Sequence, residues 1–175
     1  MTPRTFPPAP GWSPAGHRIK APLEYSRGED KAWVSGALGV RDGQTLTQTA
    51  PSRNTAGYLT LLQALDQAYP TGELYLIADN LSSHTSGPIQ AWLAEHLRGH
   101  HAFIPVGAAW LNLIEGWWRW LPRAAVAGQC FANRAEIALA VRVATRQLTT
   151  RACPWIWGRP PKTPRQFRRR FVYSL

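Results

Sequence analysis

Cysteine, acidic residues and long apolar runs are all scarce in this sequence. The 175 residues include only two cysteines, Cys130 and Cys153, which can build neither a disulfide framework nor a cysteine-rich metal site. His96, His100 and His101 lack a cysteine or an acid at ligand spacing, so we expect a surface cluster and not a zinc site. No apolar run approaches the roughly 18 residues that cross a membrane, and a signal-peptide pattern is missing. We therefore expect a cytoplasmic protein without a membrane partner.

The acidic residues stop at Glu136, which leaves the end of the chain strongly basic. Residues 1–136 carry 11 Lys and Arg against all 10 Asp and Glu, whereas residues 137–175 carry nine Lys and Arg and no acid. Aromatic residues such as Trp157 and Phe167 interleave with these cations. Such clusters are typical of surfaces that bind phosphate backbones. The pattern therefore favours nucleic acid as a partner over a merely solubilising tail.

Proline divides the chain into three parts. Residues 1–16 hold five prolines and predict an extended arm, because proline breaks helices and central strands. Residues 152–175 form a basic tail rich in proline and arginine. Residues 17–151 lie between them in a chain that is 45% apolar and 17% charged, and they suffice for one globular domain with a core.

The domain begins with the pattern of an antiparallel meander. Stretches with high β-propensity occur at residues 17–19, 31–40 and 45–49. Asp42 and Gly43 form a typical hairpin turn between the last two stretches. We therefore expect three consecutive antiparallel strands.

Helices and strands alternate after the meander. Asn54 can cap a helix whose apolar residues follow helical spacing, and Ser86 with a following proline starts a second helix. Further strands are predicted at residues 74–78 and 102–104. The order of three strands followed by helix, strand, helix and strand predicts a mixed α/β sheet with flanking helices.

Two more helices follow the last predicted strand. Residues 109–121 carry a helical apolar stripe that includes Leu111, and we expect Pro122 to stop this helix. The next helix covers residues 133–149 and opens with the capping-box pattern Asn-x-x-Glu at residues 133–136.

The run Leu-Tyr-Leu-Ile-Ala at residues 74–78 is the centre of the functional argument. Its apolar residues do not alternate with polar ones, which predicts a strand buried on both faces. The run ends at Asp79, and a polar loop with Asn80 and His84 follows. Because ligands of open α/β sheets collect at the carboxyl ends of strands, Asp79 is a candidate site residue. The alternative is an acid that only caps a turn.

A second acid, Glu115, lies on the helix predicted after the last strand. The residues between Asp79 and Glu115 suffice for one helix, one strand and a turn, a path that can bring the two acids together. Converging carboxylates repel one another unless a hard divalent cation neutralises them, so the pair predicts Mg²⁺ or Mn²⁺. Such a site can activate a water or a 3′-hydroxyl for phosphoryl transfer. The alternative is a solvated helix residue.

Two blocks of sequence carry a resemblance to a known family. They read Leu76-Ile77-Ala78-Asp79-Asn80-x-x-x-His84 and Pro105-x-x-Ala108-Ala109-Trp110-Leu111-Asn112-x-x-Glu115. Together they resemble the DDE transposases of bacterial insertion sequences, and in particular the mariner-related insertion sequence six-thirty family. The arm Gly11-Trp12-x-Pro14-x-Gly16, the segment Gly36-Ala37-Leu38 and the pair Pro154-x-x-Trp157 are also similar to that family, so the resemblance covers roughly residues 6–160.

The resemblance implies a ribonuclease-H-like fold and metal-dependent DNA cleavage followed by strand transfer. Asp79 would be the second catalytic acid of the family and Glu115 the third, both as ligands of Mg²⁺ or Mn²⁺. Asn80, His84 and Asn112 would shape the site or hydrogen-bond DNA, although His84 can equally be a structural loop residue. The implied partners are transposon-end and target DNA, together with a second copy of the chain in the DNA complex.

The sequence departs from the family at its beginning. The first catalytic Asp of the family ends a hydrophobic strand just before the proline-rich arm, and this chain has no acid before Glu24. The first, central strand of the ribonuclease-H-like sheet is therefore expected to be missing, as are the N-terminal helix-turn-helix domains. Two strand edges would lose their partner, at a cost on the order of 1–3 kcal/mol per missing backbone hydrogen bond. An upstream fragment on another chain could supply both the strand and the Asp.

Seven cations are candidates for contact with DNA. One lies on the helix that carries Glu115 and the others lie in the basic tail. They are Arg119, Arg159, Lys162, Arg165, Arg168, Arg169 and Arg170.

Three functional hypotheses follow. The first is a truncated transposase catalytic domain that lacks the first Asp and has little activity alone. The second is a non-catalytic DNA-binding relic or regulator of transposition, which needs no metal. The third is a metal-dependent nuclease in which Glu24 or Asp30 moves into the site.

Overall fold

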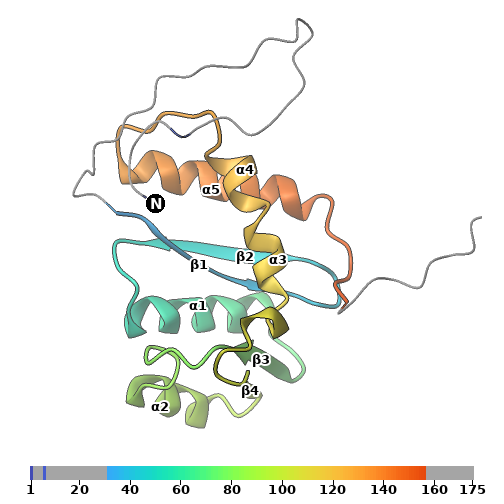
Figure 1. Cartoon of the computed structure of the whole chain (residues 1–175). Helices are drawn as coiled ribbons and strands as arrows, with labels where there is room; N and C mark the ends of the chain where they lie inside the picture. The colour runs from blue at the N-terminus through green and yellow to red at the C-terminus, as the bar shows by residue number, and fades with distance from the viewer. Residues whose placement is uncertain (2–5, 7–30, 157–175) are drawn as a thin grey trace, which may run out of the picture.

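The computed structural model of the chain describes Met1, Phe6 and residues 31–156. The described residues form four strands, five α-helices and one 3-10 helix (Figure 1). In chain order these are β1 Trp33–Leu38, β2 Thr45–Ala50, α1 Thr55–Ala68, β3 Leu74–Ala78, α2 Gly87–Glu95, β4 Gly99–Phe103, η1 Ala109–Leu111, α3 Ile114–Trp118, α4 Leu121–Ala125 and α5 Arg134–Thr149. The mixed α/β composition is the one that the sequence predicts.

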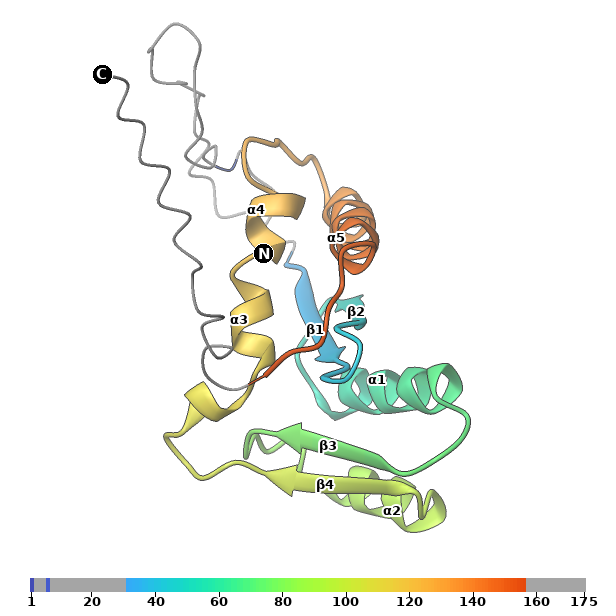
Figure 2. The same cartoon turned by 90° about the vertical axis from the view of Figure 1, so that its right-hand side faces the viewer.

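The four strands form two separate two-stranded sheets. β1 and β2 are antiparallel, with Trp33 opposite Ala50 and Leu38 opposite Thr45. β3 and β4 are parallel, and their register runs from Leu74 opposite Gly99 onward. Helix α1 lies between the two sheets, and α4 and α5 lie on the other side of β1 and β2 (Figures 1 and 2). The predicted strand at residues 17–19 and most of the predicted arm lie outside the described residues.

Side-chain caps fix the two longest helices where the sequence predicts them. Asn54 Oδ1 accepts a hydrogen bond of 2.9 Å from the Gly57 N–H at the start of α1. Asn133 Oδ1 accepts one of 3.0 Å from the Glu136 N–H at the start of α5. Glu136 completes the box by accepting from the Ala132 N–H at 2.8 Å, one residue before the cap. Each cap satisfies backbone donors that have no partner inside the helix.

The predicted helix over residues 109–121 is wrong in its boundaries. The segment is divided into η1, α3 and α4, and Pro122 lies in the first turn of α4 instead of ending a helix. Proline fits there because the first N–H groups of a helix have no intrahelical acceptor. Leu111 is 36% exposed and does not join the core, whereas Leu121 is buried.

The prediction that β3 is buried on both faces is also wrong. Tyr75 is 71% exposed and Ile77 is 41% exposed. Leu76 pairs with His101, whose ring contacts Tyr58 of α1, so this face of the sheet packs on the helix. No helix among the described residues covers Tyr75 and Ile77. One covered face and one open face explain the alternating burial.

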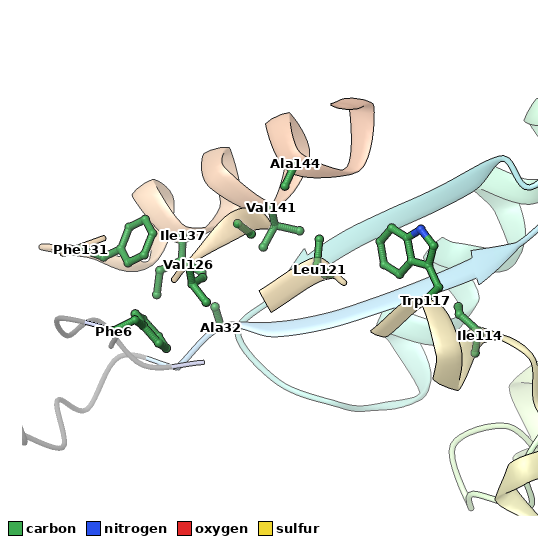
Figure 3. Close-up of a cluster of buried hydrophobic side chains, with 11 residues drawn as sticks. Phe6, Ala32, Ile114, Trp117, Leu121, Val126, Phe131, Ile137, Val141 and Ala144 are labelled. Carbon is green, nitrogen blue, oxygen red and sulfur yellow. The ribbon is translucent and has the colours of Figure 1, made fainter. Parts of the chain in front are cut away.

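The main core lies away from β3, between β1 and the helices α3, α4 and α5 (Figure 3). Its side chains come from segments far apart in the sequence. They are Phe6, Ala32, Ile114, Trp117, Leu121, Ala125, Val126, Phe131, Ile137, Val141 and Ala144. This packing anchors α3, the helix that carries Glu115, against β1.

Candidate metal and nucleic-acid site

Asp79 directly follows the last residue of β3, as the sequence predicts. The next residue, Asn80, donates its side-chain amide to the Ile104 carbonyl at 2.6 Å, which ties the end of β3 to the chain just after β4. This bond connects the C-terminal ends of β3 and β4 next to Asp79. Asn80 supports the backbone at this edge and does not line the cavity described below.

His84 contacts Asp79 directly. Its Nδ1 lies 3.2 Å from the Asp79 backbone carbonyl, to which it can donate, and 2.9 Å from Oδ1 of the carboxylate. Oδ1 is buried and accepts no hydrogen bond of good geometry from a described residue, although the side chain as a whole is 48% exposed. The carboxylate therefore has one covered oxygen in contact with the imidazole and another side open to solvent.

Tyr58 of α1 builds the floor beneath this pair. Its ring lies 4.0 Å from the His84 ring, centroid to centroid, and its hydroxyl is 3.1 Å from His101 Nε2. Burial, and secondarily the negative charge of Asp79, raises the pKa of Tyr58 to about 12. Burial, and secondarily His84, lowers the pKa of His101 from its usual 6.5. Tyr58 therefore stays protonated and His101 neutral at neutral pH.

Asp79, His84, Asn112 and Glu115 all line one cavity of about 390 Å³. Its walls come from β1, β3, α1 and the η1–α3 segment. Figure 2 shows α1 between β1 and β3. Glu115 lies in the first turn of α3, and its N–H donates to the Asn112 carbonyl at 3.1 Å. The structure thus brings the two predicted acids to the same cavity, from a strand end and a helix start.

The residues of the cavity suit a hard divalent cation in chemistry but form only part of a coordination sphere. Asp79, Glu115 and the Asn112 amide offer oxygen ligands, and Asp79 Oδ1 is a covered oxygen without a hydrogen bond. No three His, Cys, Asp or Glu side chains within the described part of the chain come close enough to hold a metal ion together.

The structure describes one of the seven cations that are predicted to contact DNA. Arg119 follows α3 and is exposed, but it does not line the cavity. The other six, Arg159, Lys162, Arg165, Arg168, Arg169 and Arg170, lie outside the described residues.

Two neighbours of the site are absent from the sequence-based site prediction. Tyr58 fits the apolar stripe of α1 and gives no sign of a polar role in the sequence. His101 is predicted within a surface cluster, but the three histidines take separate partners: His96 stacks on Trp92 and His100 pairs with Glu73. His96 caps the end of α2, and alternation along β4 separates the other two, since His101 shares a face with Leu76 and His100 with Tyr75.

Two solved structures have similar folds. The chain is similar to the catalytic core domain of BIV integrase, with a TM-score of 0.52 and 22% identity over 66% of this chain and 73% of that one. It is also similar to the Mos1 transposase in a paired-end complex with the left transposon end, with a TM-score of 0.55 and 15% identity over 86% of this chain and 50% of that one. These likenesses confirm the ribonuclease-H-like fold of integrase and transposase catalytic cores.

The sequence comparison then assigns the family. Residues 2–138 match the DDE superfamily endonuclease model, so the chain belongs to that family. It is 30% identical over 91 residues to the insertion element IS630 uncharacterized 39 kDa protein of Shigella sonnei. The match covers 51% of this chain and about a quarter, 26%, of that relative. The predicted kinship with DDE transposases of the insertion sequence six-thirty family is confirmed.

Family membership sets the general chemistry. DDE endonucleases depend on metal ions, which is consistent with the oxygen ligands that line the cavity. No helix among the described residues is long and apolar enough to cross a membrane.

Proposed function

We propose that this chain is a catalytic-domain portion of a DDE transposase, in which Asp79 and Glu115 are ligands of Mg²⁺ or Mn²⁺. The reaction would be metal-dependent DNA strand cleavage followed by strand transfer. The observation that carries the proposal is that Asp79, Asn112 and Glu115 all line one cavity.

The residues around the acids have separable positioning roles. His84 holds the carboxylate of Asp79 through the 2.9 Å contact, and its ring rests on Tyr58. Asn80 fixes the strand end through its bond to Ile104. A metal ion bound at the acids would supply activation of a hydroxyl nucleophile and neutralisation of phosphate charge. A fixed carboxylate loses less entropy on binding such an ion.

The described residues supply two acids, so the proposed site needs a further ligand. We infer that an upstream fragment contributes the first strand of the sheet and its Asp, and that residues 1–175 without this fragment cleave DNA weakly or not at all. The complex would contain two copies of the chain on transposon-end and target DNA.

DNA contact is assigned to the basic residues. Arg119 is exposed on the described surface and would reach the phosphate backbone, together with the six cations of residues 152–175. Residues 1–16 would act as an arm beside the catalytic domain of residues 17–151. Because phosphate contacts are electrostatic, binding should weaken steeply with salt.

Titration calorimetry with Mn²⁺ tests the proposal on the full chain. We expect one site whose affinity falls at least tenfold in Asp79→Asn and in Glu115→Gln, because each change removes a charged oxygen ligand. Glu95→Gln is the matched control, since Glu95 is an exposed acid that does not line the cavity. A folded chain that binds no Mn²⁺, or equal binding by all variants, contradicts the proposal.

A non-catalytic DNA-binding role is the second candidate, favoured by the +9 charge of residues 137–175 and by the two-acid site. It predicts DNA binding in EDTA that falls with salt and is lost on deletion of residues 159–175. Unchanged binding after that deletion excludes this role for the tail. The third candidate, an independent nuclease, needs Glu24 or Asp30 in the site, and both lie outside the described residues.

A further inference from the structure

Arg53 brings a positive charge to the cavity that Asp79 and Glu115 line. Among the described residues it is the one lysine or arginine on the cavity wall. It lies in the exposed segment between β2 and α1, and its guanidinium forms no ion pair or hydrogen bond with a described residue. A guanidinium carries five N–H donors and no acceptor, so Arg53 keeps these donors for a ligand from outside the chain.

The indole ring of Trp33 restrains this guanidinium. Arg53 Cζ lies 5.4 Å from the centroid of the Trp33 ring, which is the range of a cation–π contact. Trp33 begins β1 and pairs with Ala50 at the end of β2, so Trp33 and Arg53 lie at one end of this sheet. Both residues line the cavity, and Trp33 is 43% exposed. The contact therefore reduces the freedom of a long side chain that remains accessible to a ligand.

A series of contacts connects the start of α1 to the candidate metal ligand Asp79. Asn54 directly follows Arg53 and caps α1, and its carbonyl accepts the Tyr58 N–H at 3.2 Å. The Tyr58 ring lies 4.0 Å from the His84 ring, centroid to centroid, and His84 Nδ1 lies 2.9 Å from Asp79 Oδ1. An anion held by Arg53 would therefore lie on the wall of the cavity that also carries the acids.

Ser52 adds a second donor next to Arg53. Its hydroxyl oxygen accepts a hydrogen bond of 3.0 Å from the Asn54 side-chain amide, so the hydroxyl proton is not used in that contact. Ser52 is exposed and lines the same cavity. α1 begins at Thr55 and contributes the positive end of its helix dipole. A guanidinium, a hydroxyl and a helix start thus favour an anion at this part of the wall.

A phosphodiester fits these donors best, because the same cavity carries acids suited to a divalent cation. The planar fork of an arginine matches two oxygens of a phosphate group. The ions that Asp79 and Glu115 suit, Mg²⁺ and Mn²⁺, also bind phosphate oxygens. A ligand that satisfies both the ion and Arg53 therefore carries phosphate oxygens at more than one point, as a nucleic-acid backbone does.

We propose that Arg53, restrained by Trp33 and assisted by Ser52, binds a phosphodiester group of the DNA strand that enters the cavity. Arg53 thereby positions the strand so that a neighbouring phosphate meets the acids. Trp33 is a positioning residue that acts through Arg53. The inference rests on the proposed function for the identity of the strand as DNA, and it adds a DNA-binding residue outside the seven cations predicted from the sequence.

An NMR titration of the full chain in EDTA tests the proposal. The probe is thymidylyl-thymidine, TpT, which has a single phosphodiester and no terminal phosphate. We expect saturable shifts of the Arg53 Nε–H and Trp33 indole N–H signals. The Kd read from the Trp33 signal should rise at least fivefold in Arg53→Gln, and at least threefold in Arg53→Lys, which keeps the charge without the planar fork. Unchanged affinity in Arg53→Gln, or no shift of either signal, overturns the proposal.

Three controls identify the ligand and the site. The methylphosphonate analogue of TpT has no backbone charge and should not shift the Arg53 signal; an equal shift overturns the phosphate contact. Arg123 is an exposed arginine of α4 that does not line the cavity, so Arg123→Gln should bind TpT as the parent does. An equal loss in Arg123→Gln and Arg53→Gln overturns a specific site. Inorganic phosphate at the concentration of TpT should leave TpT bound; full reversal of the shifts indicates a site for a free anion and overturns the DNA assignment.

Two variants at Trp33 test its contact with the guanidinium. Trp33→Phe keeps an aromatic face and should bind TpT within twofold of the parent. Trp33→Leu should move the Arg53 Nε–H signal of the free protein and weaken TpT binding at least threefold. Equal binding by Trp33→Leu and the parent contradicts the role of the ring. Circular dichroism of each variant verifies folding.

The outcome is separable from that of the metal proposal. Because the titration contains no metal, a failure of TpT binding leaves the Mn²⁺ result untouched. Arg53→Gln should also bind Mn²⁺ at least as tightly as the parent, since Arg53 is not a metal ligand. A chain that binds TpT through Arg53 but binds no Mn²⁺ would keep the phosphodiester site and contradict the metal site.

Discussion

At the scale of single residues, the site depends on a short chain of contacts that starts at Asp79. The carboxylate touches His84, the imidazole rests on Tyr58, and the phenol hydroxyl bonds His101. The contact with His84 holds the Asp79 carboxylate on one side, and the other side of the carboxylate stays open to solvent. A change at any of these positions should reach Asp79 through packing as well as through charge.

Acid should weaken the fold through His101. Its pKa is lowered in the folded chain by burial and then by His84, so the unfolded chain takes up a proton first as the pH falls below the usual value of 6.5. The free energy of unfolding should therefore decrease from pH 7.5 to pH 5. Urea unfolding at both values should show a smaller decrease for His101→Phe than for the parent. Equal pH dependence of the parent and of His101→Phe contradicts this assignment.

Loss of the Asn80 side chain should loosen the end of the parallel sheet. Asn80→Ala removes the 2.6 Å bond to Ile104 and leaves a carbonyl that is covered in the folded chain without its donor. We expect a loss of about 1–2 kcal/mol in the free energy of unfolding. Gln90→Ala on the exposed side of α2 is the control and should cost less than about 0.5 kcal/mol.

At the scale of elements, the helix caps decide where α1 and α2 begin, and they do so with different strengths. Asn54 bonds a backbone N–H of α1, whereas Ser86 makes no such bond to α2 and relies on the proline in its first turn. Asn54→Ala should cost about 1 kcal/mol of stability and Ser86→Ala less than half of that. Urea unfolding compares the two, and a larger loss for Ser86→Ala would contradict this ranking of the caps.

The sequence predicts elements well where local chemistry decides and poorly where tertiary packing does. Asn54 and Asn133 carry their signal in the side chain, so both helix starts are predictable. The apolar run at residues 74–78 does not reveal that Tyr75 and Ile77 lack a covering partner, because burial depends on segments elsewhere. The proline at 122 has the same chemistry at a stop and at a first turn, and only the packing of α4 separates the two.

At the scale of the molecule, residues of both two-stranded sheets line one cavity, and both predicted acids line it too. Asp79 and Glu115 are predicted as a pair through the resemblance of the two sequence blocks that contain them to DDE transposases, and both line the cavity. Tyr58 and His101 are not, since their role arises only when α1 crosses the parallel sheet. Residues 1–136 have nearly balanced charge and residues 137–175 carry +9, so in the sequence a candidate DNA-binding segment follows a candidate metal-binding domain.

The most direct test of the central claim locates the metal ion within the folded chain. Substoichiometric Mn²⁺ broadens the NMR signals of nearby nuclei, so the amide signals of Asp79, His84, Asn112 and Glu115 should disappear first. Glu95 and Glu136, which lie on other helices and do not line the cavity, should keep their signals. Broadening centred on these control acids, or none at all in a folded chain, would contradict the assignment of Asp79 and Glu115 as metal ligands.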